Sequence, residues 1–244
     1  MSWVAHDLEP YILQRKLGRT AITISFPALV LGSWGPDILT KWFVHGLGFS
    51  GLHLRASDPV QFHRGWPGVG FTHSLAFGVV VAAVVYVTSR NSSWAIGLML
   101  GLWLHTLSDV GDTVGVMLFF PFTTHLYALG AWANADTSSR ISDAAAYYSG
   151  IGGIWDAFWV VLVIASWRVL RRDYFSDRVA PRDGFWGWIG KRLPENAVLA
   201  VYRGAIFYGI CRFAGWMLWA HVLHHYAFDP SWGGPQWAHP AHLG

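Results

Sequence analysis

The sequence has few charged residues for its length. Asp, Glu, Lys and Arg make up 13% of the 244 residues, about half the fraction expected of a soluble domain. Hydrophobic residues make up 53%, and the mean hydropathy is +0.34. Because a soluble globular domain does not have this balance, the composition predicts a membrane protein.

Cysteine is almost absent, since Cys211 is the only one. A disulfide within the chain and a multi-cysteine zinc or iron–sulfur site are therefore excluded, so any metal must be held by His, Asp and Glu. The amino terminus lacks a basic region followed by an apolar core, and we expect no cleavable signal peptide. The length allows one bundle of four to six helices, so we expect a single domain over residues 1–244. No repeat recurs at a fixed period.

Tryptophan, in contrast, is abundant, with 16 residues. Its ring suits the level where acyl chains meet headgroups. The net charge is +3, but the basic residues gather in a few segments that are typical of the flanks of membrane spans. We therefore expect membrane lipid, and no nucleic acid, as a partner.

The apolar runs predict an all-α fold, a polytopic transmembrane helical bundle. Its five spans are expected at about residues 17–34, 71–88, 94–120, 150–169 and 197–226. Residues 1–16 predict a short interfacial helix, and the Gly- and Pro-rich residues 35–70 predict loops with one short helix. Residues 170–196 predict a basic cytoplasmic linker.

The positions of Lys and Arg predict the orientation of the bundle. If the amino terminus is cytoplasmic, five spans place eleven of these residues inside, against Lys41, Arg55, Arg64 and Arg140 outside. This arrangement follows the positive-inside rule and leaves the carboxyl terminus outside. It also places the candidate ligand groups described below toward the non-cytoplasmic face.

A polar stripe crosses the third predicted span. At roughly 100° per residue, one narrow face of a helix carries all of its members, which are Gly101, His105, Ser108, Asp109 and Asp112. An imidazole and two carboxylates are costly in lipid and are usually retained to bind an ion, carry protons or meet a partner inside the protein.

The spacing of His105 and Asp109 allows both side chains to bind one divalent ion, because residues i and i+4 of a helix point the same way. The carboxylate could also bridge two ions. Asp37 and His73 are predicted at the same depth. Zinc suits this ligand set, and manganese or iron fits nearly as well. The alternative is a hydrogen-bonded pair that joins two helices.

A metal at this position predicts a hydrolase. The ion lowers the pKa of a bound water to about 7, and the hydroxide so formed attacks an ester. Asp112 is the candidate general base. At the outer face, a soluble substrate would arrive from water, whereas a lipid could enter from the bilayer.

Two flanking segments carry further candidate ligands. Asp37 follows a Gly-Pro break, although the same break could simply end a helix. His63 and His73 lie ten residues apart, and Thr72 could cap a helix that begins at His73. In that alternative, His73 is only an interfacial residue at a helix start.

These segments together resemble the YdjM-like family of bacterial inner-membrane proteins, which are described as metal-dependent hydrolases. The resemblance covers about residues 26–122 and rests on a shared order of short motifs, namely Gly32-Ser33 with Pro36-Asp37, His63-Arg64-Gly65 with Thr72-His73-Ser74, and Gly101, His105 and Asp109 with Pro121-Phe122. It implies a multi-pass protein of the bacterial inner membrane. It also implies as metal ligands Asp37, His73, His105 and Asp109, with His63 as a further candidate.

The sequence departs from the family pattern in three places. Residues 66–70 separate parts that the family keeps contiguous, the only early histidine is His6, and Asp156 stands where a second His-x-x-x-Asp motif would need a histidine as well. A fold that has lost its chemistry is therefore an alternative, as a structural or accessory subunit packed against other membrane subunits. A transporter of protons or ions is a third hypothesis.

Three further histidines have more than one interpretation. They could complete the metal site or form an interfacial cluster; they are His221, His224 and His225. A histidine on a membrane span can also bind a haem or related pigment, which is a further alternative for the histidines of this chain.

Overall fold

The computed structural model describes residues 4–17, 23–49, 63–66, 68–132, 140–231 and 236–239. These residues are mostly helical, which confirms the all-α class. The longer helices are α1 (Ala5–Leu17), α2 (Phe26–Phe49), α4 (Leu75–Ser89), α5 (Ser92–Asp109), α7 (Ile151–Ala165) and α10 (Glu195–Met217). Helix α6 (Arg140–Tyr148) precedes α7, and a π-helical stretch, η5 (Leu218–Leu223), prolongs α10.

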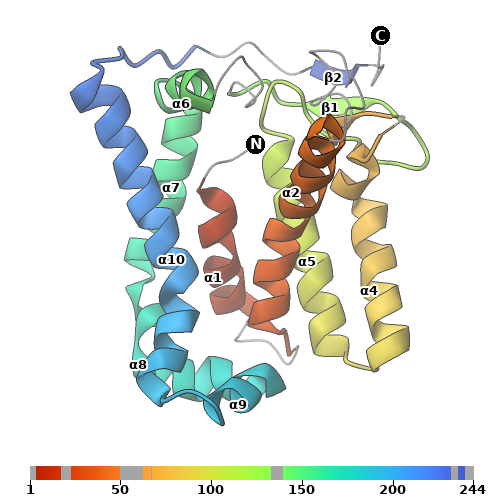
Figure 1. Ribbon diagram of the computed structural model, residues 1–244, viewed down its shortest axis with the longest axis vertical. Coiled ribbons are helices and arrows are strands. Elements are labelled where there is room, and N and C mark those ends of the chain that lie inside the picture. The colour runs from red at the N-terminus through yellow and green to blue at the C-terminus, as the bar shows by residue number, and fades with distance from the viewer. Residues whose placement is uncertain are drawn as a thin grey trace.

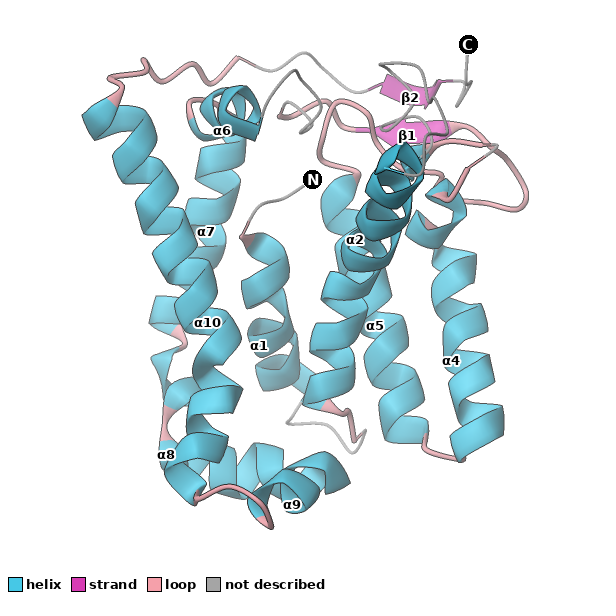
Figure 2. Cartoon of the chain, viewed as in Figure 1, coloured by secondary structure: helices cyan, strands magenta, loops and turns pink. Residues whose placement is uncertain are grey.

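The long helices run alternately up and down between two ends of the molecule (Figure 1). Helix α5 packs against both α2 and α4, whereas α1 contacts α2, α5, α7 and α10. Helix α1 therefore lies between two groups of helices, one formed by α2, α4 and α5 and the other by α7 and α10. The loops and a short antiparallel pair, β1 (Leu126–Ala128) and β2 (Gln236–His239), gather at one end, where Leu126 is in register with His239 (Figure 2).

Short helices cover the opposite end. The predicted linker 170–196 folds into η2 (Trp167–Leu170), α8 (Arg172–Tyr174), η3 (Phe175–Val179), η4 (Ala180–Arg182) and α9 (Gly184–Gly190). Trp186 of α9 is buried and packs edge-on against Phe175 and Tyr202, and Phe26 and Tyr11 join the same core.

Local chemistry explains the tight turn between α4 and α5. The side chain of Asn91 accepts a hydrogen bond from the backbone N–H of Trp94 at 3.1 Å and so caps α5. Arg90, just before it, has a φ of 55° and ends α4 in the left-handed conformation. This turn lies where the sequence predicts the break between the spans at about residues 71–88 and 94–120.

The predicted end of the first span was wrong. Helix α2 does not stop at residue 34 but continues through Pro36 to Phe49, so residues 35–49 are helical and not a loop. The predicted start near residue 17 was wrong as well, because α1 ends at Leu17 and α2 begins at Phe26. Proline removes a backbone N–H and costs a helix about 3 kcal/mol. The extensive packing of α2 on α5 outweighs this local cost.

The predicted end of the third span was also wrong. Helix α5 ends at Asp109 and not near residue 120. The side chain of Asp112 takes backbone N–H groups that a longer helix would use for its own hydrogen bonds. Its Oδ1 accepts hydrogen bonds from the N–H groups of Val114 and Gly115 at 3.0 and 2.6 Å. Gly115 then takes a positive φ of 73°, which turns the chain back.

Residues 1–16 were expected to form an interfacial helix. Helix α1 exists, but its first residues are buried inside the bundle, among them His6, Asp7 and Glu9. The interfacial placement was therefore wrong, because the buried polar side chains find partners that hydropathy alone does not reveal.

One helical stretch of the described residues is long and apolar enough to cross a membrane. It is Glu195–Leu223, with a mean hydropathy of 1.3. The apolar helices Leu75–Ser89 and Ile151–Ala165 are shorter, at about 1.5 Å per residue against a hydrocarbon core of about 30 Å. Five spans and the orientation of the termini therefore stay predictions.

Candidate metal centre

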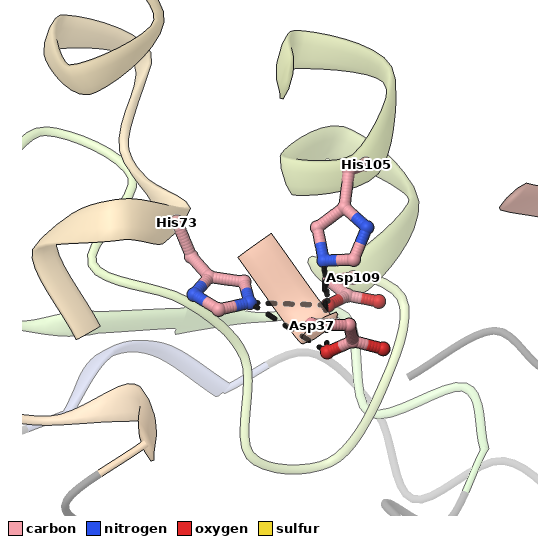
Figure 3. Close-up of side chains that lie close together, drawn as sticks. All are labelled: Asp37, His73, His105 and Asp109. Atoms are coloured by element: carbon pink, nitrogen blue, oxygen red, sulfur yellow. Dashed lines mark ion pairs between the residues drawn. The ribbon is translucent and has the colours of Figure 1, made fainter. Parts of the chain in front are cut away.

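Four side chains with metal-ligating atoms converge beside the carboxyl end of α5. Asp37 comes from α2, His73 from the short helix η1 (Gly70–His73), and His105 and Asp109 from α5. One ligand atom of each lies within 4.8 Å of those of the others, and Figure 3 shows the two imidazole rings directed at the two carboxylates. The structure thus brings together residues that are as many as 72 positions apart in the sequence.

The distances between the ligand atoms are close to those around a shared ion. The Nε2 atom of His105 lies 3.2 Å from Oδ2 of Asp109 and 3.8 Å from Oδ1 of Asp37. Nε2 of His73 lies 4.0 Å from the same two oxygen atoms. Ligand atoms that share a tetrahedral zinc ion at about 2.0–2.2 Å are themselves roughly 3.3–3.6 Å apart, so small side-chain movements would bring these atoms to that geometry. These four side chains could therefore hold a metal ion.

Hydrogen bonds fix the tautomer of both histidines. Nδ1 of His105 lies 2.7 Å from the backbone carbonyl of Ser33, which only accepts, so Nδ1 carries the proton. The hydroxyl of Thr72 donates to the carbonyl of Val69 at 2.7 Å, which leaves its oxygen to accept from Nδ1 of His73 at 3.0 Å. In the neutral form of each ring, Nε2 therefore presents the lone pair that a metal ligand requires.

Burial keeps His73 neutral. Its side chain is fully buried, and this desolvation, together with the positive charge of Arg64, holds its pKa well below the usual value. The Nε2 atoms of His73 and His105 have no hydrogen-bond partner among the residues that the structure describes. A buried nitrogen lone pair without a donor is costly, and a metal ion would satisfy it.

Arg64 is one of two residues at this site that sequence reasoning missed. Its guanidinium is fully buried, with Nη2 2.6 Å from Oδ2 of Asp109 and 3.5 Å from Oδ2 of Asp112. These carboxylates raise the pKa of Arg64 against the opposing effect of burial. The only feature of the sequence that pointed to a role for Arg64 was its place in the His63-Arg64-Gly65 motif.

The charges of the site leave room for a divalent cation. Asp37, Asp109 and Asp112 bring three negative charges, and Arg64 brings one positive charge. Against the opposing effect of burial, Asp109 and Glu9 raise the pKa of His6 to about 10, so His6 adds a positive charge that Glu9 balances. If His73 and His105 bind through neutral rings, two negative charges remain in a largely buried region. Since buried charge must be compensated, this balance favours an ion of charge +2.

His6 was also missed as part of the site. Its Nε2 lies 3.2 Å from Oδ1 of Asp109, and its ring stacks on that of His105 with centroids 4.1 Å apart. On its other side, Nδ1 lies 3.6 Å from a carboxylate oxygen of Glu9. Sequence reasoning assigned His6 no role because it lies ahead of the first predicted span.

Two predicted site residues lie next to the group of four. Nε2 of His63 is 3.4 Å from Oδ1 of Asp37, so it remains a candidate ligand. Asp112 is fully buried and binds backbone N–H groups and Arg64, and its role as general base stays a prediction.

The carboxyl-terminal histidines have other contacts. Both ring nitrogens of His221 lie near backbone carbonyls, those of Tyr148 at 3.0 Å and Tyr226 at 3.1 Å. The ring of His224 packs against Trp219 and Tyr226. These contacts agree with an interfacial cluster better than with completion of the metal site.

A comparison with known protein families identifies the chain. A family model described as YdjM inner membrane protein matches residues 10–175. The chain belongs to the YdjM inner membrane protein family. It is therefore a membrane protein of the inner membrane, as the motifs predicted. No curated protein and no solved structure matches the chain.

The YdjM match includes every site residue predicted from the sequence, from Asp37 to Asp112. It begins after His6 and ends before α10. The part of the chain that matches therefore carries the four clustered side chains and Arg64, while His6 reaches the cluster from outside it.

Proposed function

We propose that this YdjM-family protein is a membrane-embedded, metal-dependent hydrolase of an ester or phosphoester. The observation that carries the proposal is the convergence of two imidazole Nε2 atoms and two carboxylates within 4.8 Å. Zinc is the ion that this donor set suits first, and manganese or iron would also fit. A bound ion would activate water and polarise the oxygen of the scissile group.

The protein side chains would divide the remaining tasks. Asp37 has 16% of its side chain exposed, whereas His73, His105 and Asp109 are fully buried, so substrate would approach from the side of Asp37. Arg64 holds Asp109 with Nη2, while its Nε and Nη1 have no hydrogen-bond partner among the described residues. These two donors would bind negative charge on a substrate oxygen, which favours a phosphoester.

An aromatic surface beside the site supports a substrate from the bilayer. Trp66, Phe119 and Phe122 are exposed, Phe122 by 91%. The rings of Trp66 and Phe71 pack on Phe120, which ties this surface to the segment that carries His63, Arg64 and His73. Aromatic rings of this kind suit the membrane interface, where a lipid would meet the site, on the outer face if the predicted orientation holds.

The test is hydrolysis by the purified chain in lipid nanodiscs with added zinc. The substrates are a neutral carboxylic ester, a phosphodiester and a phospholipid, each compared for the wild type, His73→Ala, Arg64→Met and Arg172→Gln. Arg172 is the control because it forms an exposed ion pair with Glu195.

We expect turnover of a phosphoester that falls at least about 100-fold in His73→Ala and Arg64→Met and is unchanged in Arg172→Gln. The contrary result is a metal-loaded wild type that hydrolyses none of these substrates and is isolated with a partner subunit in fixed stoichiometry. That result would rule out the hydrolase and favour the accessory-subunit function.

A further inference from the structure

Helix α1 is unusual because it is polar and yet lies inside the bundle (Figures 1 and 2). Its 13 residues extend for only about 20 Å, too short to cross a bilayer. The side chains of His6, Asp7, Glu9 and Gln14 are nevertheless buried. Each such group is costly in a membrane protein unless it has a partner, so specific contacts must hold α1 in place.

The amino end of α1 is capped by a side chain from another helix. Oδ1 of Asp156, on α7, accepts hydrogen bonds from the backbone N–H groups of Val4 and Ala5 at 3.2 and 3.1 Å. Its Oδ2 accepts a hydrogen bond from the hydroxyl of Tyr148 at 3.2 Å. The first N–H groups of a helix have no partner within the helix, and a carboxylate at this end is stabilising. Asp156 therefore anchors α1 to α7.

A second anchor joins α1 to α10. Oδ2 of Asp7 lies 3.4 Å from Nη2 of Arg212. Gly209, one turn earlier on α10, allows this approach, because a Cβ at that position would lie 2.9 Å from Cβ of Asp7. Asp7 thus faces α10, while its neighbour His6 turns the other way.

The two anchors determine where His6 lies. His6 follows Ala5, which Asp156 binds, and precedes Asp7, which Arg212 binds. Its ring reaches α5, where it contacts Asp109 and stacks on His105. The hydroxyl of Ser33 on α2 adds a hydrogen bond to the carbonyl of His6 at 2.9 Å.

We propose that Asp156 and Arg212 are positioning residues, which seat α1 so that His6 holds the carboxylate of Asp109 in its metal-binding orientation. The contribution to metal binding rests on the proposed function, whereas the seating of α1 does not. Residues that orient a metal ligand through hydrogen bonds typically contribute 10-fold to about 100-fold to metal affinity.

The test uses the full chain in nanodiscs and two measurements. The first is hydrogen exchange of the backbone amides within residues 4–10, of which only Pro10 has no N–H, in metal-free protein. The second is titration with Co²⁺ followed by its visible absorption. The variants are Asp156→Leu, Asp156→Asn and Arg212→Met. Tyr11→Phe is the control, since it removes a different contact of α1, the hydrogen bond from Tyr11 to the carbonyl of Tyr202.

We expect Asp156→Leu and Arg212→Met to speed exchange at residues 4–10 at least about 10-fold and to weaken Co²⁺ binding about 10-fold. Asp156→Asn should stay near the wild type, because its amide oxygen accepts the same two N–H groups. Tyr11→Phe should bind Co²⁺ as the wild type does.

Two results would overturn the inference. One is unchanged exchange at residues 4–10 in Arg212→Met and in any folded Asp156→Leu protein. The other is an equal loss of Co²⁺ affinity in Tyr11→Phe, which would mean that any loosening of α1 suffices. If the wild type binds no Co²⁺ but the exchange pattern is as expected, the seating of α1 stands and the proposed function fails.

Discussion

The ring of His105 on α5 is oriented by the backbone of Ser33 on α2, whose carbonyl oxygen lies 2.7 Å from Nδ1. This contact requires the two helices to be very close. The Cβ of an alanine at position 101 would lie 2.3 Å from the carbonyl oxygen of Leu29 and 2.8 Å from the nitrogen of Ser33. The close approach of two backbones therefore orients a candidate ligand.

Gly101→Ala should accordingly push α2 and α5 apart. We expect a loss of about 1–3 kcal/mol in unfolding free energy, as for overpacked cores, measured by denaturation in mild detergent. Gly35→Ala is the matched control on α2, because its added Cβ meets nothing within 4 Å. Equal stability of the two variants would show that α2 and α5 are not in close contact.

Asp112 has two possible roles that one pair of substitutions separates. Its Oδ1 accepts two backbone hydrogen bonds that an asparagine could also accept. If Asp112 is the general base, Asp112→Asn should lose activity by at least about 100-fold. Its melting temperature should fall less than that of Asp112→Ala, because the asparagine keeps the turn and loses only the ion pair with Arg64. Full activity in Asp112→Asn would show that Asp112 is not the general base and serves only to hold the turn and to pair with Arg64.

The pH dependence of stability should reveal the buried neutral His73. Its folded pKa lies well below the unfolded value of 6.5, so below pH 6.5 the unfolded state binds more protons. The contribution of the neutral His73 side chain to the unfolding free energy is therefore fully present above pH 6.5. It is lost as the pH falls toward the folded pKa, by up to about 1.4 kcal/mol per pH unit.

Melting curves of metal-free protein between pH 8 and pH 5 measure this effect. His73→Gln should flatten the acid side of the profile, whereas His125→Gln, which removes an exposed imidazole, should leave it unchanged. A profile that His73→Gln does not alter would contradict the burial of a neutral imidazole.

The orientation in the membrane is tested separately by reporter fusions. The turn between α4 and α5 and helix α9 lie at one end of the bundle, and the metal centre lies toward the other (Figure 1). The positive-inside rule makes the first end cytoplasmic. A periplasmic reporter fused after residue 135 should be active, and one fused after residue 180 should not. The reverse pattern would invert the predicted topology.

The sequence carried much of the information about the site. Helical periodicity placed His105 and Asp109 on one face of α5, and the motif order linked them to Asp37 and His73, which the structure brings within 4.8 Å. Their role as ligands stays a prediction. Apolar runs also located α4 and α10 to within a few residues.

The sequence could not reveal features that depend on tertiary contacts. No local sequence feature shows that α2 continues through Pro36. The apolar residues 114–120 extend the helical pattern of α5 in the sequence, and no local feature shows that the turn at Asp112 follows the helix instead. His6 lies in a polar helix whose burial depends on Asp156, which is 150 positions away. Hydropathy therefore assigned α1 to the interface when it belongs to the interior.

The proposed function requires Asp37, His73, His105 and Asp109 to hold a metal ion. Elemental analysis of the purified chain, after incubation with zinc and removal of unbound ion, tests this requirement. We expect at least about one equivalent of metal per wild-type chain and its loss in the double variant His105→Ala plus Asp109→Ala. Less than about one equivalent in the wild type, or the same content in the double variant, would contradict the proposed function.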